Sequence, residues 1–237
     1  MAGVQALVGL LPHVKRKTGR RGHRRRLILF LLLLTATLGV IGWLYYGVAA
    51  DKHRPQPSPH ETVVEDLADC CRRKHVKSVQ YDHFARLADV EQEASTGNLF
   101  RALAYSERIQ EQQAALAILR LGGRYVPPKR VVVFRGPTAG NLERSILYER
   151  RSEDTLYYHQ IHRHLHSGNR LSARALIWAA TIDRRHRNLL EATRIGVTSE
   201  GVRHYTVCPR CGNTYLLEEQ DPYCPHCLTD SRFFVQF

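Results

Sequence analysis

The sequence predicts a mostly α-helical protein with three parts: an N-terminal transmembrane helix, a four-helix bundle, and a small C-terminal module with β-structure held by cysteines. Three observations lead to this fold class. An uncharged apolar run covers residues 27–48, four stretches of helical apolar periodicity lie between residues 62 and 195, and two Cys-x-x-Cys motifs stand near the C-terminus. The chain of 237 residues leaves room for one bundle domain beside the other two parts.

The apolar run 27–48 has 22 positions without a charged residue, which is enough to cross a bilayer as a helix. Eight Lys and Arg residues and no acidic residue lie in residues 1–50, and only Lys52 and Arg54 follow the run closely. This bias predicts a basic cytoplasmic segment over 1–26 and a main domain that is periplasmic or extracytoplasmic. Trp43, Tyr45 and Tyr46 fall at the outer end, where aromatic rings favour the headgroup level. A cleaved signal peptide is the alternative interpretation.

The net charge of +13 is concentrated in this N-terminal block. The 35 Lys and Arg residues less these eight leave 27, against 22 Asp and Glu residues, for the rest of the chain. The folded part is therefore only mildly basic. This distribution argues against a nucleic-acid partner.

A proline-rich linker is predicted over 49–61, because Pro55, Pro57 and Pro59 favour an extended spacer. Thr62 and Glu65 form a capping-box pattern, so a first helix is expected to begin there and to run to about residue 94. Gly97 is expected to break this helix before the next one begins.

The second helix is expected from Asn98 to the glycines at 122–123, and the third from about 141 to 167. Between them, residues 124–140 read as a long crossover that contains two prolines and a β-prone run at 131–134. Gly168 ends the third helix, and Asn169 caps a fourth that reaches about residue 195. Two helical hairpins joined by one long crossover predict a ferritin-like four-helix bundle over 62–196.

The motifs Cys-Pro-Arg-Cys and Cys-Pro-His-Cys are separated by twelve residues in a predicted module over 201–237. Two loops that each present a pair of thiolates can enclose one ion in a tetrahedral sulfur cage, and such a cage selects zinc or iron. Two disulfides are the alternative, although the short Cys-Pro-x-Cys turn has awkward geometry for one. The predicted metal ligands are Cys208, Cys211, Cys224 and Cys227.

The chain resembles the rubrerythrins, in which a ferritin-like di-iron bundle precedes a rubredoxin-like module. In the tail, the resemblance rests on Cys-Pro-x-Cys-Gly-x-x-Tyr, the gap of twelve residues, the second Cys-Pro-x-Cys and the aromatic end. In the helices it rests on the spacing of Tyr81, Phe84-Ala85, Leu99-Phe100, Asn141-Leu142 and Tyr157.

The family holds two irons with a Glu on the first helix, Glu-x-x-His on the second, Glu-x-x-Glu on the third and Glu-x-x-His on the fourth. By this pattern four positions keep a ligand-type residue: Glu107 and Asp183, which would bridge the irons, and Glu149 and His186, which would complete one of them. Three positions are replaced, and the resemblance assigns all three to the other iron: Lys74, Gln110 and Ser152.

Two interpretations of this degenerate site remain open. One non-haem iron could bind to the four remaining residues, or the residues could form a polar cluster without metal. In either case the Lys74 ammonium could take the place of the missing iron and relieve the repulsion between buried carboxylates. Glu111 and Glu153 stand one residue from replaced positions, and a slight helix rotation would recruit them.

Two other groups of residues are candidates for smaller roles. His159, His162 and His166 share one stripe of the third helix, which is expected to face solvent or a partner rather than the ligand face. Cys70 and Cys71 precede Lys74 by one turn and are expected to pack in the interior. A disulfide to another chain is the alternative for these two cysteines.

Two functions follow as expectations. In the first, the protein is a membrane-anchored non-haem iron protein whose rubredoxin-type centre passes electrons to the bundle or to a membrane partner. The family reduces peroxide at two irons, and the three replaced ligands put that activity in question here. In the second, the chain is a structural or accessory subunit of a membrane complex with a structural zinc or iron. The resemblance also implies a homodimer.

Overall fold

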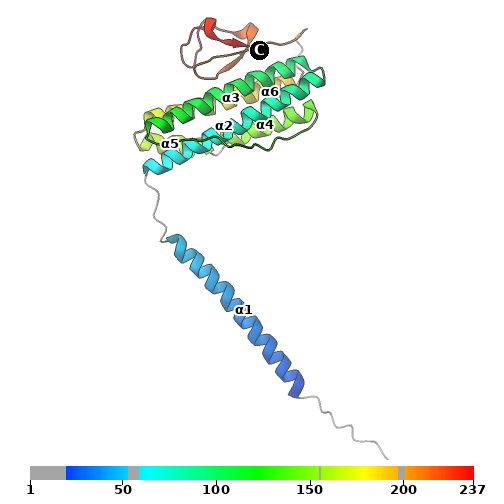
Figure 1. Ribbon diagram of the computed structural model, residues 1–237, viewed down its shortest axis with the longest axis vertical. Coiled ribbons are helices and arrows are strands. Elements are labelled where there is room, and N and C mark those ends of the chain that lie inside the picture. Colours follow the sequence, from blue (N-terminus) through cyan, green and yellow to red (C-terminus); the bar gives the residue numbers. More distant parts are fainter. Residues whose placement is uncertain (1–19, 53–58, 155, 197–200) are drawn as a thin grey trace, which may run out of the picture. The chain divides into compact units, whose positions relative to one another are not determined.

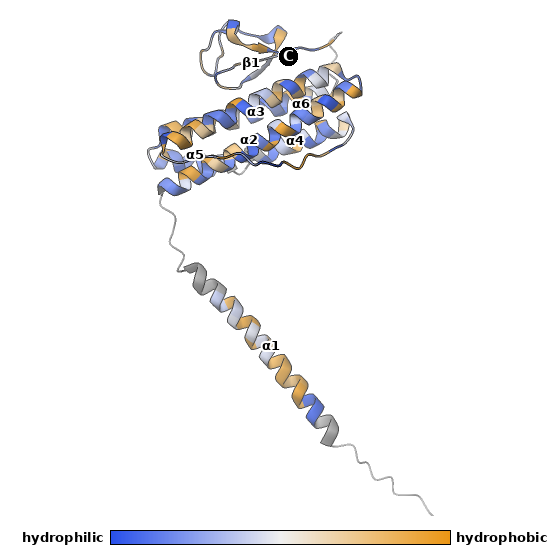
Figure 2. Cartoon of the chain, viewed as in Figure 1, coloured by the Kyte–Doolittle hydropathy of each residue, from blue (hydrophilic) through white to orange (hydrophobic). Residues whose placement is uncertain are grey.

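The computed structural model describes residues 20–52, 59–154, 156–196 and 201–237 of the chain. The chain divides into two units, residues 1–56 and residues 57–237. The first contains helix α1 (Arg20–Lys52), in which Arg24–Tyr46 is long and apolar enough to be a candidate membrane span. Figure 2 shows apolar residues along much of this helix. Most of the predicted basic segment, together with Pro55 and Pro57 of the linker, lies outside the described residues.

The second unit contains the helical bundle that the sequence predicts (Figure 1). Its helices are α2 (Pro59–Val90), α3 (Ala94–Arg120), α4 (Thr138–Asp154), α5 (Leu156–His166) and α6 (Arg170–Arg194). The third predicted helix is thus described as two consecutive helices, α4 and α5. The N-cap prediction for α6 is confirmed, because the Asn169 side chain accepts a hydrogen bond from the Ser172 amide at 3.3 Å.

Two predicted helix boundaries are wrong. Helix α2 begins at Pro59 rather than at the Thr62 capping box, because proline suits the first turn, where its missing N–H needs no partner. Gly97 lies inside α3, and the turn before α3 contains Gln92 with a φ of 61°. A Cβ at Gly97 would lie 2.8 Å from the Asp89 carboxylate, so this glycine permits a close approach of α2 and α3.

The crossover between α3 and α4 contains no strand among its residues, although 131–134 is β-prone. The Gln80 side chain instead satisfies both backbone groups of Phe134. Its amide donates to the Phe134 carbonyl at 3.1 Å, and its carbonyl oxygen accepts from the Phe134 amide at 2.8 Å. The connection is therefore fixed to α2 by a side chain rather than by a strand partner.

Two apolar clusters fill the bundle, one toward each end, and a polar layer lies between them. One cluster packs Tyr81 on Phe100, with ring centroids 5.9 Å apart, and also contains Leu189. The other surrounds Leu67 and Tyr157. On α2 the buried Lys74 and Lys77, and on α6 Asp183 and His186, fall between the two clusters along the chain, whereas on α3 Glu107 and Gln110 flank Ile109 of the first cluster.

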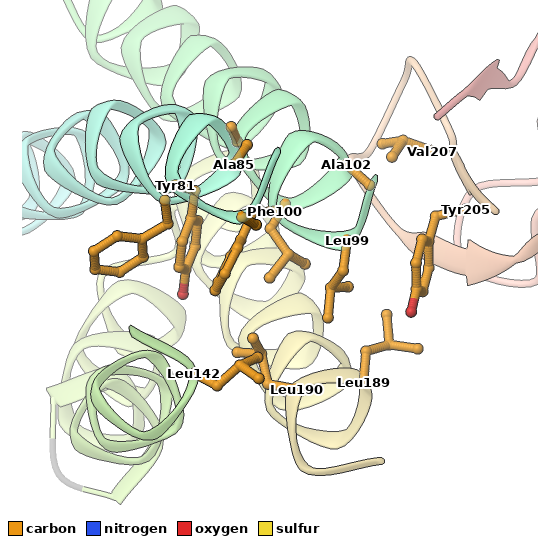
Figure 3. Close-up of a cluster of buried hydrophobic side chains, with 14 of the residues drawn as sticks. Tyr81, Ala85, Leu99, Phe100, Ala102, Leu142, Leu189, Leu190, Tyr205 and Val207 are labelled. Atoms are coloured by element: carbon orange, nitrogen blue, oxygen red, sulfur yellow. The ribbon is translucent and has the colours of Figure 1, made fainter. Parts of the chain in front are cut away.

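The C-terminal module is a three-stranded antiparallel sheet in the order β2-β1-β3. Its strands are β1 (Tyr205–Val207), β2 (Thr214–Leu216) and β3 (Val235–Gln236). Tyr205 and Val207 belong to the first apolar cluster of the bundle, and Figure 3 shows Tyr205 near Leu189. The module therefore packs directly on the bundle of its own chain.

Candidate metal centre and bundle core

The four predicted cysteine ligands lie together at the loops of the C-terminal module. The Sγ atoms of Cys208 and Cys227 are 3.5 Å apart, those of Cys211 and Cys224 are 3.6 Å apart, and all four lie within 4.8 Å of one another. An ion with metal–sulfur distances of about 2.3 Å in a regular tetrahedron places its sulfurs about 3.8 Å apart. The cage therefore fits one zinc or iron ion. All six cysteines are free within the chain, so the alternative of two disulfides in the C-terminal module is not adopted.

Hydrogen-bonding groups surround the sulfurs. The Tyr215 hydroxyl lies 3.2 Å from the Cys224 sulfur, and the Thr229 hydroxyl lies 3.1 Å from the Cys227 sulfur. Backbone amides add further hydrogen bonds, among them that of His226 to Cys224. Such donors stabilise the negative charge that four thiolates and one ion leave on the site.

The bundle brings together the four residues at which the resemblance expects ligands. One ligand atom from each of Glu107, Glu149, Asp183 and His186 lies within 4.8 Å of the others, and all four side chains are fully buried. They come from α3, α4 and α6. By composition and spacing, this group could hold a metal ion.

Two lysines enter the same layer from α2. The Lys74 ammonium contacts Glu107 at 3.2 Å and forms a short ion pair with Asp183. The Lys77 ammonium pairs with Glu149 and contacts Asp183 at 3.2 Å and Glu107 at 3.7 Å. The sequence analysis identified Lys74 but missed Lys77, although their spacing of three residues puts both on one helix face.

The lysines and carboxylates set each other's protonation. Burial alone would lower the pKa of Lys74 and of Lys77, but the carboxylates of Asp183 and Glu107 outweigh burial and raise both pKa values above the ordinary value. Burial opposes ionisation of Asp183 and Glu107, yet the two ammoniums lower the pKa of each. Two cations therefore face two firmly ionised carboxylates.

Glu149 is the third carboxylate of this layer. Burial, together with its carboxylate neighbours, raises the pKa of Glu149 to about 8 despite Lys77. The Tyr81 hydroxyl donates to Glu149 at 2.5 Å. Glu149 therefore holds its proton more tightly than Asp183 and Glu107 do, and those two ionised carboxylates balance the two lysines without a metal ion.

The replaced ligand positions do not supply further metal ligands. The Gln110 amide nitrogen donates to the Ser106 hydroxyl at 3.1 Å. Glu111, the neighbouring alternative, bonds to His75 at 3.1 Å rather than facing the layer. The side chains of Ser152 and Glu153 lie outside the described residues. The two-iron set of the rubrerythrin pattern therefore does not fit the residues that the structure describes here.

The two sites are joined by a short chain of polar contacts. His186 Nε2 lies 3.0 Å from the Ser106 hydroxyl, which in turn donates to the carbonyl of Gly212, the residue after Cys211. Gly212 has a φ of 85°, and a Cβ there would lie 3.0 Å from the Ser106 carbonyl oxygen. A glycine is required at this contact, because any other side chain would collide with α3.

The remaining candidates lie where the sequence analysis expected them. Cys70 and Cys71 are buried in the second apolar cluster. The side chains of His159, His162 and His166 are exposed on α5. The analysis missed the buried His164, whose Nε2 lies 3.2 Å from an Asp66 carboxylate oxygen.

No protein-family model matches the chain, and no curated protein matches it significantly. Among solved structures, the fully reduced, all-ferrous form of nigerythrin, of the rubrerythrin family, superimposes with a TM-score of 0.67 at 20% identity. The match covers 74% of this chain and 86% of nigerythrin. A bacterioferritin of Mycobacterium tuberculosis gives a TM-score of 0.50 at 16% identity, over 57% of this chain and 89% of its own. These matches confirm the ferritin-like fold, and nigerythrin covers a larger share of the chain than bacterioferritin does.

Proposed function

We propose that this chain is a membrane-anchored iron protein that carries single electrons through its four-cysteine centre. The supporting observation is the exposure of the cage: Cys208, Cys211 and Cys224 are buried, whereas Cys227 is partly exposed. A tetrathiolate iron supplies a one-electron couple when it is bound. The Cys227 edge is the face where an external partner can approach the centre, while the rest of the cage is shielded from water.

Iron is favoured over zinc by the nature of the structural neighbour. The nigerythrin structure that shares this fold is described as all-ferrous, and its match extends over 74% of the chain. The proposal does not include peroxide reduction. That reaction needs two electrons, and the bundle of this chain does not fit the pair of irons that would supply them.

The chain's own residues keep the cage in a fixed shape. The loop after Cys211 is anchored on α3 through Gly212, and Trp178 of α6 packs against the cysteine cluster. The Tyr215 ring stacks on Phe234, with centroids 5.6 Å apart. A cage held on several sides changes little in geometry when the charge of its ion changes, which favours rapid electron transfer.

Metal analysis of the full-length chain in detergent tests the proposal. We expect one iron per chain, a visible thiolate-to-iron absorption that bleaches on reduction, and a reversible potential in a redox titration. A chain that binds only zinc and shows no reversible absorption would refute electron transfer through this centre. Metal content should be measured on protein produced with both ions supplied, because thiolate cages bind either one.

A structural or accessory role in a membrane complex is the second candidate, and one observation favours it. Tyr205 and Val207 of the module belong to the core of the bundle, so an ion that folds the module also consolidates one end of the bundle. A zinc ion would serve this purpose as well as iron. The metal analysis above separates the two functions, since only the first requires a redox-active ion.

The orientation of the anchor gives a separate prediction. A reporter active only outside the cytoplasm, fused after Phe237, should be active, because the basic block before the apolar run is retained on the cytoplasmic side. The same reporter fused ahead of Met1 of the full-length chain should be inactive. The opposite pair of activities would show that the chain is inserted the other way round.

A further inference from the structure

We propose that the ammonium groups of Lys74 and Lys77 take the places of both metal ions of a di-iron bundle, so that this bundle is a salt-bridged core that needs no metal. The inference concerns the bundle alone. It does not depend on which ion the cysteines hold or on electron transfer through them.

The first argument is the position of the two nitrogens. Glu107 and Asp183, which would bridge two irons in the rubrerythrin pattern, each contact both ammoniums. Lys77 also pairs with Glu149, the residue that would complete the one iron whose ligands remain. The ammoniums thus reproduce the pattern of two cations bridged by two carboxylates.

The second argument is that the remaining ligand atoms are already engaged. His186 Nδ1 lies 3.2 Å from the Glu107 carboxylate, and its Nε2 lies 3.0 Å from the Ser106 hydroxyl. A metal ion bound by His186 would have to displace one of these contacts. It would also have to displace Lys77 from Glu149, which holds one of the shortest ion pairs of this layer.

The third argument is charge. Both lysines are buried, with exposed fractions of 0% and 7%, and each ammonium lies within 3.7 Å of two or three carboxylates. A divalent ion added beside two buried ammoniums meets strong repulsion in a medium of low dielectric constant. The carboxylates of the layer balance the two lysines and leave too little negative charge for a metal pair.

This assignment revises the expectation that a single iron persists on Glu107, Glu149, Asp183 and His186. The sequence suggested one erased and one surviving half of the site, and the contacts of Lys77 place a cation in the surviving half as well. The bundle would then accept no electrons, and the four-cysteine centre would be the metal site of the part of the chain that the structure describes.

Residual metal in a chain without a functional cysteine cage provides the main test. The full-length Cys211→Ser/Cys224→Ser variant, loaded with Fe²⁺, Mn²⁺ or Zn²⁺ in separate experiments and then desalted, should retain less than a tenth of an ion per chain. One retained ion per chain that is lost when Asp183→Asn is added would overturn the proposal. The wild-type ion count is measured in parallel, so that a zinc-loaded cage, which refutes the proposed electron transfer, is not mistaken for a bundle ion.

A gain of binding tests the role of Lys77 directly. Adding Lys77→Ala to the cysteine variant should raise metal retention to about one ion per chain and should make the melting temperature rise on addition of Mn²⁺. Lys129→Ala is the matched control, because Lys129 is an exposed lysine outside the bundle core, and it should change neither quantity. Metal retention by the Lys129→Ala control equal to that of Lys77→Ala would overturn the proposal.

A second variant tests whether Lys77 occupies a metal position even if Lys77→Ala fails to fold. Introduced into the cysteine variant, the changes Lys74→Glu, Gln110→His and Ser152→Glu restore the ligand types of the rubrerythrin pattern but leave Lys77 in place. We expect this triple variant to bind less than one ion per chain, and to bind two only when Lys77→Ala is added. Two ions bound by the triple variant alone would show that the Lys77 ammonium does not occupy a metal position.

Discussion

Replacing Cys224 by serine should remove the bound metal and unfold residues 201–237, while most helical structure is retained. The module has three strands of two or three residues each, and so small a unit lacks the apolar core to fold without its ion. The measurements are metal content, protease sensitivity of the tail and far-ultraviolet circular dichroism. The metal signal should fall from one ion per chain to none.

The packing of the module on the bundle adds a second expectation for this variant. Tyr205 and Val207 lie in the same apolar cluster as Leu189, so loss of the tail exposes one end of the bundle and should lower its melting temperature. Cys70→Ala is the matched control, because Cys70 is a buried cysteine outside the cage. Helical signal that disappears together with the tail would contradict two separately folding parts.

Lys77→Met should destabilise the bundle by about 3 kcal/mol, because it removes one of two cations from a buried group of carboxylates. Methionine preserves most of the side-chain volume, so the loss reports charge rather than a cavity. Lys129→Met, at an exposed position, should change the free energy of unfolding by no more than about 0.5 kcal/mol. Chemical unfolding followed by circular dichroism measures both.

The double variant Lys77→Met/Glu149→Gln separates pairing from packing. If the cost of Lys77→Met comes from carboxylates left without their cation, replacing Glu149, the carboxylate nearest to Lys77, should recover part of the lost stability, and the two changes should not be additive. A Lys77→Met variant as stable as the wild type would show that the charge of Lys77 does not stabilise the bundle.

Much of the candidate site could be predicted because its signals are local or strictly spaced. Each cysteine pair lies within four residues, and the four cysteines meet as expected. Glu107, Glu149, Asp183 and His186 converge because each stands on the interior face of its helix. Lys74 was identified because it occupies a position where the rubrerythrin pattern has a carboxylate, and its ammonium contacts both Glu107 and Asp183.

Lys77 was missed because comparison with a ligand pattern examines only the positions of ligands. A charged residue one turn from another on a buried helix face is visible in the sequence, but its burial depends on carboxylates from three other helices. Gly97 illustrates the same limit. In the local sequence, a glycine predicts the end of a helix. Gly97 instead lies inside α3 and permits the approach of Asp89 from α2, which is a tertiary contact.

The polar layer between the two apolar clusters also restricts how the helices can align. Apolar clusters alone tolerate a shift of one helix by a turn, since one leucine or alanine replaces another at little cost. A one-turn shift of α2 would bring one lysine to the level of the other, carry the second toward an apolar cluster and leave Glu107, Asp183 and Glu149 with a single cation. The layer therefore fixes the vertical register of α2 against α3 and α6, as a buried polar residue does in a coiled coil.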